Sequence, residues 1–390
     1  MWGLRARNSC VCRGLGRAAF SVLHSEAAVA ATRSSEFRVG VLGLGAIGTI
    51  FFTRLGLLAT NSKTPALNVD AFIKPQQFEA WARKEKLQFA LKKDGGQETL
   101  EFQVDSNEEV ATAIDTRNVR VRTLESELGD ERLDVLLVAV KAYDSAAVVR
   151  ELRENSRHLL KHDALCVLLQ NGLGEVPLEE RLTGGDDRWQ FANGVTFVGG
   201  RALGFGNVLV SGLDTGMTYL APFGGDGSED EGAKMKVLAE VFLAAGIHCE
   251  VLKTGGMQAM LWRKLIVNAA INPLASLLNA MNKSVANSEG SRRCVDMVVQ
   301  EALAVAQSEQ IPLSCTQNEL VEEILAVARN TGTNVCSMLA DLRRGSRTEI
   351  DAITGRIVAG GKRHGIPTPT NELLLSLIKA LETEGTRRVQ

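Results

Sequence analysis

The chain has 390 residues, of which 45% are hydrophobic and 23% are charged, and its formal net charge is −2 at pH 7. This composition is typical of a globular protein with room for two domains of ordinary size. The apolar runs are shorter than the roughly 18 residues that a membrane-spanning helix needs, so no membrane segment is predicted. The nearly balanced charge gives no reason to expect a nucleic-acid partner.

The first 33 residues differ from the rest of the chain because they contain five arginines and a single acid, Glu26. An Arg-rich, acid-poor segment is typical of a mitochondrial transit peptide. We therefore predict a transit peptide at residues 1–33 and a location in the mitochondrial matrix. The alternative is an extension without targeting information, which would leave the protein in the cytoplasm.

The seven cysteines and five histidines are scattered along the chain. Their spacing fits neither a disulfide framework nor a set of metal ligands. No metal site is predicted.

A glycine-rich stretch begins the first predicted domain. In FRVGVLGLGAIGTIFFTRLGLLA, residues 37–59, a Val-rich apolar run is followed by three spaced glycines and then by a helical pattern. Gly43 permits a tight turn, Gly45 lets the backbone approach a pyrophosphate, and Gly48 allows close helix packing. The sequence therefore predicts a dinucleotide-binding turn, with a merely flexible glycine turn as the alternative. Its members are Gly43, Leu44, Gly45, Ala46, Ile47 and Gly48.

The end of the second predicted strand, VDAFI at 69–73, indicates which nicotinamide cofactor fits. An acid there would bind the ribose hydroxyls, whereas this chain has Lys74. A cation favours the additional phosphate of NADPH, so NADPH is the predicted cofactor. The alternatives are a solvated loop lysine and Asp70 as the ribose ligand, although Asp70 comes early in the strand.

Further strands are predicted at 133–141 and 164–172, each apolar enough to be covered on both faces, as parallel strands are. Lys141 and Asn171 stand at their carboxyl ends, where ligands of open α/β sheets bind. They are candidates for contacts with cofactor and substrate, and a surface lysine and a turn asparagine are the alternatives. Three β-prone pieces between 191 and 222 are predicted to extend the same sheet as antiparallel strands, and a helix and strand at 236–252 are predicted to continue it. The predicted fold is thus α/β, with a Rossmann-type dinucleotide-binding domain over residues 36–253.

Beyond Thr254 the apolar residues recur with the helical period, which predicts an all-α domain over residues 254–390. The expected helices cover 257–282, 289–308, 316–330, 334–344, 348–364 and 370–383.

The first of these helices contains LWRKLIVNAAINPL, residues 261–274. Lys264, Asn268 and Asn272 recur every four residues and so form a stripe about 12 Å long on one face of an otherwise apolar helix. Buried polar groups need partners, and a lysine removed from water has its pKa lowered. Pro273 is expected to kink the helix. We interpret the stripe as ligand-binding; the alternative is a lysine that reaches solvent and asparagines that bond neighbouring helices.

Five motifs together resemble the ketopantoate reductases, also called 2-dehydropantoate 2-reductases. They are GLGAIG at 43–48, VAVKAYD at 138–144, LLQNGLG at 168–174, LWRKLIVNAAINPL at 261–274 and SMLADLRRGSRTEIDAITG at 337–355. The resemblance implies an NADPH-binding Rossmann domain, a helical domain, and a substrate cleft between them. It also implies reduction of 2-dehydropantoate to (R)-pantoate, a step of pantothenate and coenzyme A synthesis.

The resemblance also implies roles for individual residues. Lys264 would hydrogen-bond the keto oxygen and donate the proton, and Glu349 would bond the substrate hydroxyl and help to orient the lysine. The substrate would be held by Asn171, Asn268, Asn272 and Ser337. The glycine turn and Lys74 would hold the cofactor, with Lys141 and Asn171 between cofactor and substrate. For Glu349 the alternative is a helix-surface charge paired with Arg347 or Arg356.

Two alternatives to ketopantoate reduction stay open at this point. The chain could reduce another bulky 2-oxo acid, because the apolar pocket residues that select the substrate cannot be located. It could also be a catalytically silent NADP-binding regulatory protein, although such a protein would have no use for a proton donor. The expected partner is a small 2-oxo acid, with no nucleic acid and no membrane; a homodimer is compatible with the sequence.

Overall fold

The computed structural model describes residues 36–60, 67–75, 77–78, 86–93, 99–105, 113–116, 118–126, 128–154, 157–172, 189–223 and 232–385. The transit peptide predicted at residues 1–33 lies outside them. The described residues divide into two compact units, those within 36–170 and 189–254, and those within 255–385 together with 171–172. Each unit is described separately below.

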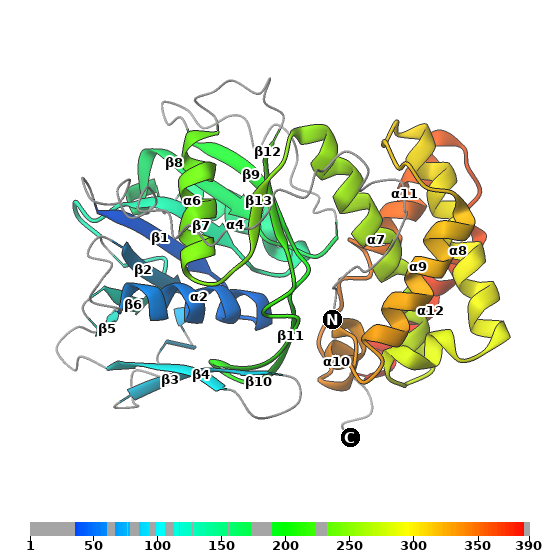
Figure 1. The fold of residues 1–390 in the computed structure, drawn as a ribbon, viewed down its shortest axis with the longest axis horizontal. Helices are drawn as coiled ribbons and strands as arrows, with labels where there is room; N and C mark the ends of the chain where they lie inside the picture. Colours follow the sequence, from blue (N-terminus) through cyan, green and yellow to red (C-terminus); the bar gives the residue numbers. More distant parts are fainter. Residues whose placement is uncertain are drawn as a thin grey trace. The chain divides into compact units, whose positions relative to one another are not determined.

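The first unit is built on a nine-stranded sheet whose central strands are parallel (Figure 1). Parallel pairing joins β8 to β7, β7 to β1, β1 to β2 and β2 to β6. The sheet order is β13-β12-β9-β8-β7-β1-β2-β6-β5. The strands are β1 (Phe37–Leu42), β2 (Leu67–Phe72), β5 (Ala113–Thr116), β6 (Val119–Arg122), β7 (Leu133–Val138), β8 (Leu160–Leu168), β9 (Gln190–Thr196), β12 (Thr218–Pro222) and β13 (Cys249–Val251).

Helices cover both faces of this sheet. Along β7, Val135 and Leu137 belong to the core that contains α2 (Ala46–Ala59) and α6 (Ala233–Ala244). Leu136 and Val138 point to the other face, into the core beside α4 (Ser145–Glu154). The alternation follows from the two-residue period of a strand. It confirms the predicted Rossmann-type architecture.

A second sheet of four strands packs against α2 in the same unit, in the order β10-β11-β3-β4. It consists of β3 (Lys86–Lys93), β4 (Thr99–Asp105), β10 (Gly199–Gly204) and β11 (Asn207–Ser211). The prediction that all three β-prone pieces between 191 and 222 extend the main sheet was therefore wrong for β11. Its alternate residues Val208 and Val210 pack with Ile50 of α2 and Leu91 of β3 in a small separate core. β9 and β12 do extend the main sheet. The predicted antiparallel direction is confirmed for β12, which pairs with β9, and was wrong for β9, which runs parallel to β8.

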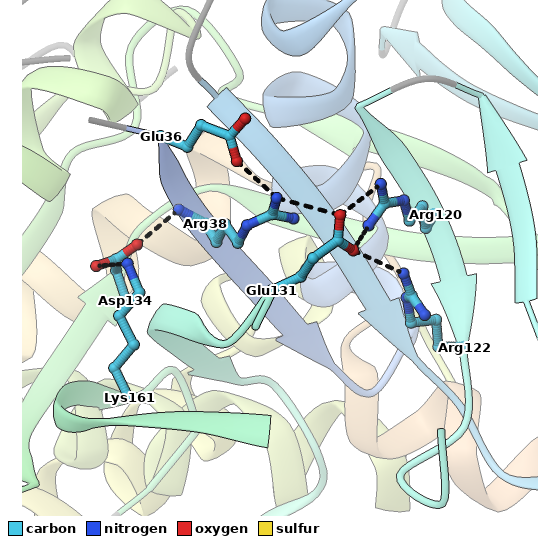
Figure 2. A network of polar contacts seen from close by, with 7 residues as sticks. All are labelled: Glu36, Arg38, Arg120, Arg122, Glu131, Asp134 and Lys161. Carbon is cyan, nitrogen blue, oxygen red and sulfur yellow. Dashed lines mark hydrogen bonds and ion pairs between the residues drawn. The ribbon is translucent and has the colours of Figure 1, made fainter. Parts of the chain in front are cut away.

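An ion-pair network ties the amino ends of the central strands together (Figure 2). Arg38, near the start of β1, bonds Glu131 at 3.4 Å, and Glu131 also accepts from Arg120. The backbone N–H of Arg38 donates to Asp134 at 2.9 Å, and Lys161 pairs with the same carboxylate at 2.8 Å. These charges satisfy one another at the edge opposite to the strand ends where ligands of such sheets bind. The network is therefore assigned to the stability of the sheet.

The second unit is helical, as predicted. Its helices enclose a core that includes Trp262, Val298, Ile324 and Ile357. They are α7 (Thr254–Leu277), α8 (Glu289–Ser308), α9 (Gln317–Asn330), α10 (Ser337–Arg343), α11 (Thr354–His364) and α12 (Pro369–Gly385), with a short 3₁₀ helix η3 (Asn282–Ala286).

Two predicted helix boundaries differ from the structure. α7 ends at Leu277 rather than 282, because Asn279 adopts a φ of 48°, the left-handed conformation that commonly follows a helix end. Residues 348–353 form turns, and α11 begins only at Thr354. There the Thr348 hydroxyl accepts the N–H of Ile350 at 3.2 Å, a local bond that competes with the helix. Glu349 thus lies on a turn and not on a helix.

Three further features concern α7 and the described residues in general. α7 is helical on both sides of Pro273, and the predicted kink stays a prediction. No helix in the described ranges is long and apolar enough to cross a membrane. Within these same ranges, no group of three His, Cys, Asp or Glu could hold a metal ion.

Candidate active site

The glycine turn connects β1 to α2 in the geometry that the sequence predicts. Gly43 has a φ of 92°, which favours glycine, and a Cβ there would lie 2.8 Å from Val140 Cγ1. A Cβ on Gly48 would lie 1.9 Å from the carbonyl oxygen of Gly43, so only glycine allows α2 this close to the turn. A Cβ on Gly45 would meet no atom within 4 Å. Gly45 therefore borders open space at the amino end of α2.

This open space fits a pyrophosphate. Gly45 is the N-cap of α2 and brings no side chain to cap the helix, and the first turn of α2 holds no acid. The first N–H groups of a helix lack intrahelical acceptors, and the helix dipole favours an anion beside them. Leu44, Ala46 and Ile47 complete the turn, and Leu44 and Ile47 also pack against the core of the first unit. The residues present at this edge thus suit a dinucleotide.

Backbone hydrogen bonds hold the carboxyl ends of the neighbouring strands beside this turn. The N–H of Gly43 donates to Phe72 O at 3.1 Å, and the N–H of Ala139 donates to Leu42 O at 2.8 Å. Lys74 lies two residues beyond Phe72 and is exposed. Lys141 lies two residues beyond Ala139 and is half-buried. Both predicted cofactor lysines are thus placed at the same edge as the glycine turn.

Asp70, the competing candidate for the ribose, has a different partner. Its carboxylate is buried and accepts from Arg122 Nε at 2.7 Å, within the sheet. A carboxylate engaged in this way is not available at the end of β2. The competing interpretation of Asp70 is therefore wrong.

In the second unit, α7 carries Lys264, Asn268 and Asn272 on one face, since four residues nearly complete a turn. Lys264 and Asn268 are half-buried, and Asn272 is buried. Within the described part of the chain, neither asparagine side chain is hydrogen-bonded to a neighbouring helix. This disagrees with the alternative in which the asparagines bond neighbouring helices, and it leaves their amides for a ligand.

The electrostatics of Lys264 fit a proton donor. Burial lowers the pKa of Lys264 to about 8 from its ordinary 10.5, and the charge of Glu349 opposes this by raising it. Glu349 is itself only 6% exposed. The two predicted catalytic residues are thus brought together, although 85 residues separate them in the sequence. A lysine whose pKa lies near 8 can both carry and release a proton near neutral pH.

The alternative partners proposed for Glu349 have carboxylates of their own. Arg347 pairs with Asp351 at 3.1 Å. Arg356 donates two hydrogen bonds to Glu309, at 3.0 and 2.6 Å, and lies over the ring of Trp262 at 5.5 Å.

Ser337 directly follows Cys336, a residue that the sequence did not single out and whose thiol contacts the backbone of Asn272. The Cys336 thiol lies 3.6 Å from the backbone carbonyl of Asn272 and 3.7 Å from Ser276 Oγ. It is also the N-cap of α10, where its sulfur accepts the N–H of Leu339 at 3.4 Å. Burial raises the pKa of this thiol, so it stays protonated. Ser337, the next residue, is exposed at the first position of α10.

Asn171 is positioned by its neighbour Gly172, which belongs to the same unit as the turn after Glu349. Gly172 has a φ of 80°, and a Cβ there would lie 2.5 Å from the carbonyl oxygen of Ala352. The Asn171–Gly172 turn therefore packs closely on residues 349–352. Asn171 and Glu349 are thus brought to one region of the helical unit.

A Rossmann-like domain with an open glycine turn, followed by a helical domain with a half-buried lysine beside a carboxylate, defines a class of dinucleotide-dependent oxidoreductases. Comparison with known proteins narrows this class. A sequence profile described as ketopantoate reductase PanE/ApbA matches residues 39–225, and the profile of its C-terminal part matches residues 256–382. The chain belongs to the ketopantoate reductase family, as the resemblance in the sequence implied.

Individual relatives agree with this membership. The 2-dehydropantoate 2-reductase of Vibrio cholerae is 31% identical over 301 residues, which cover 77% of this chain and 92% of the relative. A solved ketopantoate reductase from Ralstonia eutropha JMP134 has a TM-score of 0.67 at 24% identity, covering 90% of this chain and 100% of that one. D-mandelate dehydrogenase, solved with NADH and anilino(oxo)acetate, has a TM-score of 0.69 at 21% identity over the same shares. The two structures share the fold with this chain.

Proposed function

We propose that this protein is a 2-dehydropantoate 2-reductase that converts ketopantoate to (R)-pantoate with NADPH, a step of pantothenate and coenzyme A synthesis. The observation that carries the proposal is the arrangement around Lys264. An ammonium with a pKa of about 8 lies beside a carboxylate and on the same helix face as two asparagines whose side chains bond no neighbouring helix among the described residues.

The chemistry of a keto reduction explains this arrangement. NADPH, when bound, would supply the hydride for the keto carbon. Negative charge then develops on the keto oxygen, where a positioned cation stabilises it and a proton neutralises it. Lys264 meets both requirements, since its Nζ can donate a hydrogen bond to the oxygen and then transfer the proton. Glu349 favours the protonated form of the lysine, because its negative charge raises the pKa.

The remaining polar residues hold the substrate in this proposal. The amides of Asn268 and Asn272 and the hydroxyl of Ser337 suit a carboxylate or hydroxyl of a 2-oxo acid, as does Asn171. Glu349 accepts from the substrate hydroxyl. The asparagine amides and the serine hydroxyl donate or accept hydrogen bonds without adding a charge of their own beside the lysine.

The cofactor residues of the proposal are those at the carboxyl edge of the sheet. The glycine turn would receive the pyrophosphate, supported by the open space at Gly45. Lys74 would pair with the 2′-phosphate that distinguishes NADPH from NADH, supported by its exposed position beyond β2. Lys141 would contact the cofactor near the substrate.

The direct test follows NADPH absorbance with the purified full-length chain and a panel of 2-oxo acids. Ketopantoate is expected to give the highest kcat/KM, and NADPH to exceed NADH. Absence of turnover with every 2-oxo acid would contradict the proposal and would favour the regulatory alternative.

A second candidate is reduction of another bulky 2-oxo acid by the same residues. It is favoured by the similarity to D-mandelate dehydrogenase, whose structure was solved with NADH and anilino(oxo)acetate. The panel distinguishes the two candidates, because phenylglyoxylate would then exceed ketopantoate in kcat/KM.

We further propose that residues 1–33 direct the protein to the mitochondrial matrix, on the Arg-rich, acid-poor composition of this segment. A reporter fused to residues 1–33 would show mitochondrial import; a diffuse cytosolic signal would contradict it. A homodimer also stays a prediction, which sedimentation of the purified chain would test.

A further inference from the structure

The turn that carries Glu349 is held in place on both sides. Thr348 and Ile350, its neighbours in the chain, are both 0% exposed. The Glu349 carbonyl accepts the N–H groups of Ala352 and Ile353, both at 3.1 Å, and these local bonds fix the backbone that follows Glu349. The backbone directly before Glu349, at Thr348, depends on contacts with another element.

These contacts come from α12. Glu382 Oε1 accepts the backbone N–H of Thr348 at 2.7 Å and the Thr348 hydroxyl at 2.6 Å. One carboxylate oxygen thus fixes both the backbone and the side chain of the residue directly before Glu349. Lys379, one turn earlier on α12, bonds Asp351 at 2.5 Å and lies 3.3 Å from Glu382 Oε2. The turn is therefore bound to α12 on each side of Glu349.

We propose that Glu382, assisted by Lys379, is a positioning residue for the reaction: it holds the turn at Thr348 so that the Glu349 carboxylate stays directed at Lys264. This inference rests on the proposed function, because it assigns Glu382 a role in keeping Lys264 a proton donor. Glu382 acts only through Thr348 and Glu349 and contacts neither substrate nor cofactor in this account.

The charged groups around the turn have defined partners. Arg347 and Lys379 both bond Asp351, and Lys379 also faces Glu382. On the helices packed near Lys264, Arg263 pairs with Glu323, and Arg356 with Glu309. The charge that acts on Lys264 from the turn is that of Glu349. Displacement of Glu349 would therefore weaken the negative electrostatic potential at Lys264.

The sign of the effect follows. Glu349 raises the pKa of Lys264, so loosening the turn lowers it and deprotonates the donor at a lower pH. Activity is lost as pH rises through the pKa of the donor, so the basic limb of the kcat/KM profile would move to lower pH. The expected movement is roughly 0.5 to 1 pH unit for Glu382→Ala.

Two variants of Glu382 separate positioning from a direct charge effect. Glu382→Ala removes both the acceptor and the charge, whereas Glu382→Gln keeps an oxygen that Thr348 can bond and loses only the charge. Positioning predicts a basic limb near the original pH in Glu382→Gln and a shifted limb in Glu382→Ala. Equal shifts in the two variants would overturn the inference, since the charge of Glu382 would then act by itself.

A matched control is available at the other end of the same helix. Glu301 accepts the N–H groups of Thr370 and Asn371 at 2.8 and 2.9 Å and so anchors the start of α12. Glu301→Ala should lower the melting temperature in a comparable way while leaving the basic limb in place. A limb that moves equally in Glu301→Ala would assign the effect to general loosening of the unit and overturn the inference.

The remaining outcomes are also decisive. Should Glu382→Ala fail to fold, Thr348→Val removes only the hydroxyl contacts and should shift the limb in the same direction; an unchanged limb would overturn the inference. If the wild type turns over a 2-oxo acid and the basic limb of Glu382→Ala is unshifted, the positioning role of Glu382 is overturned while the proposed function stands. No turnover by the wild type with any 2-oxo acid would instead remove the proposed function on which the role depends.

Discussion

Glu349 acts on Lys264 across a gap of 85 residues in the sequence: burial lowers the pKa of the lysine more than the Glu349 charge raises it, and the pKa that results is about 8. The two opposing effects leave the lysine close to half-protonated at mildly alkaline pH. A donor in this state transfers its proton readily and regains it from solvent.

The pH profile of a Glu349→Gln variant tests this relationship. Removing the charge leaves burial as the main effect, so the pKa of Lys264 falls below about 8 and the basic limb of kcat/KM moves to lower pH. Because kcat/KM reports on the free enzyme, the limb follows the lysine before substrate binds. A shift of roughly one pH unit is expected. A basic limb that stays near pH 8 would show that the charge of Glu349 does not influence the pKa of Lys264.

Two glycines of the turn give opposite expectations for a single methyl group. Gly48→Ala puts a Cβ 1.9 Å from Gly43 O and should destabilise the protein by about 2 kcal/mol or more, seen as a lower denaturation midpoint. Gly45→Ala meets no atom within 4 Å and should leave stability nearly unchanged. It should nevertheless raise the KM for NADPH, because the methyl group fills the space assigned to the pyrophosphate. An unchanged KM for NADPH in Gly45→Ala would argue against that assignment.

Lys74→Ala tests the choice between cofactors. Loss of a charge-assisted bond to the 2′-phosphate is worth about 2 kcal/mol, so the KM for NADPH should rise by about tenfold or more. NADH serves as the control in the same assay, because it lacks that phosphate. Equal losses for both cofactors would remove the basis for predicting NADPH.

Cys336 offers a test of how the substrate residues are held together. Cys336→Ala removes the contacts to Asn272 and Leu339 and is expected to raise the KM for the 2-oxo acid several-fold, with the KM for NADPH unchanged. Cys336→Ser keeps a good N-cap and should stay close to the wild type. Thr316→Ala is the matched control, because the Thr316 hydroxyl caps α9 by accepting the N–H of Glu319 at 3.3 Å. Its loss should lower the free energy of unfolding by about 1 kcal/mol. If Thr316→Ala raises the KM for the 2-oxo acid as much as Cys336→Ala does, Cys336 has no specific role in holding the substrate residues.

The sequence predicted the local parts of this site. The glycine turn and the stripe on α7 depend on spacing within one strand–turn–helix unit or one helix, and local periodicity determines such features. Lys74 and Lys141 could be placed for a similar reason, because the carboxyl ends of parallel strands share an edge.

The features that the sequence could not predict depend on long-range contacts. The apolar residues of β11 alternate in a way that suits either sheet. Only the packing of Val208 and Val210 on α2 assigns the strand to the four-stranded sheet. Glu349 was expected on a helix, because the helical period continues through its segment. The bond from Thr348 to Glu382, 34 residues away, holds a turn there instead. Cys336 gave no signal, since cysteine is an unusual N-cap.

The most direct test of the central claim is the turnover of Lys264→Ala, measured with saturating NADPH and compared with Lys362→Ala, an exposed lysine of the same unit. The account predicts that kcat falls by roughly a hundred to ten-thousandfold in Lys264→Ala, the range typical of losing a positioned acid. NADPH binding and the melting temperature of that variant should not fall, and Lys362→Ala should behave like the wild type. Turnover within a few-fold of the wild type in Lys264→Ala would contradict the assignment of Lys264 as the proton donor.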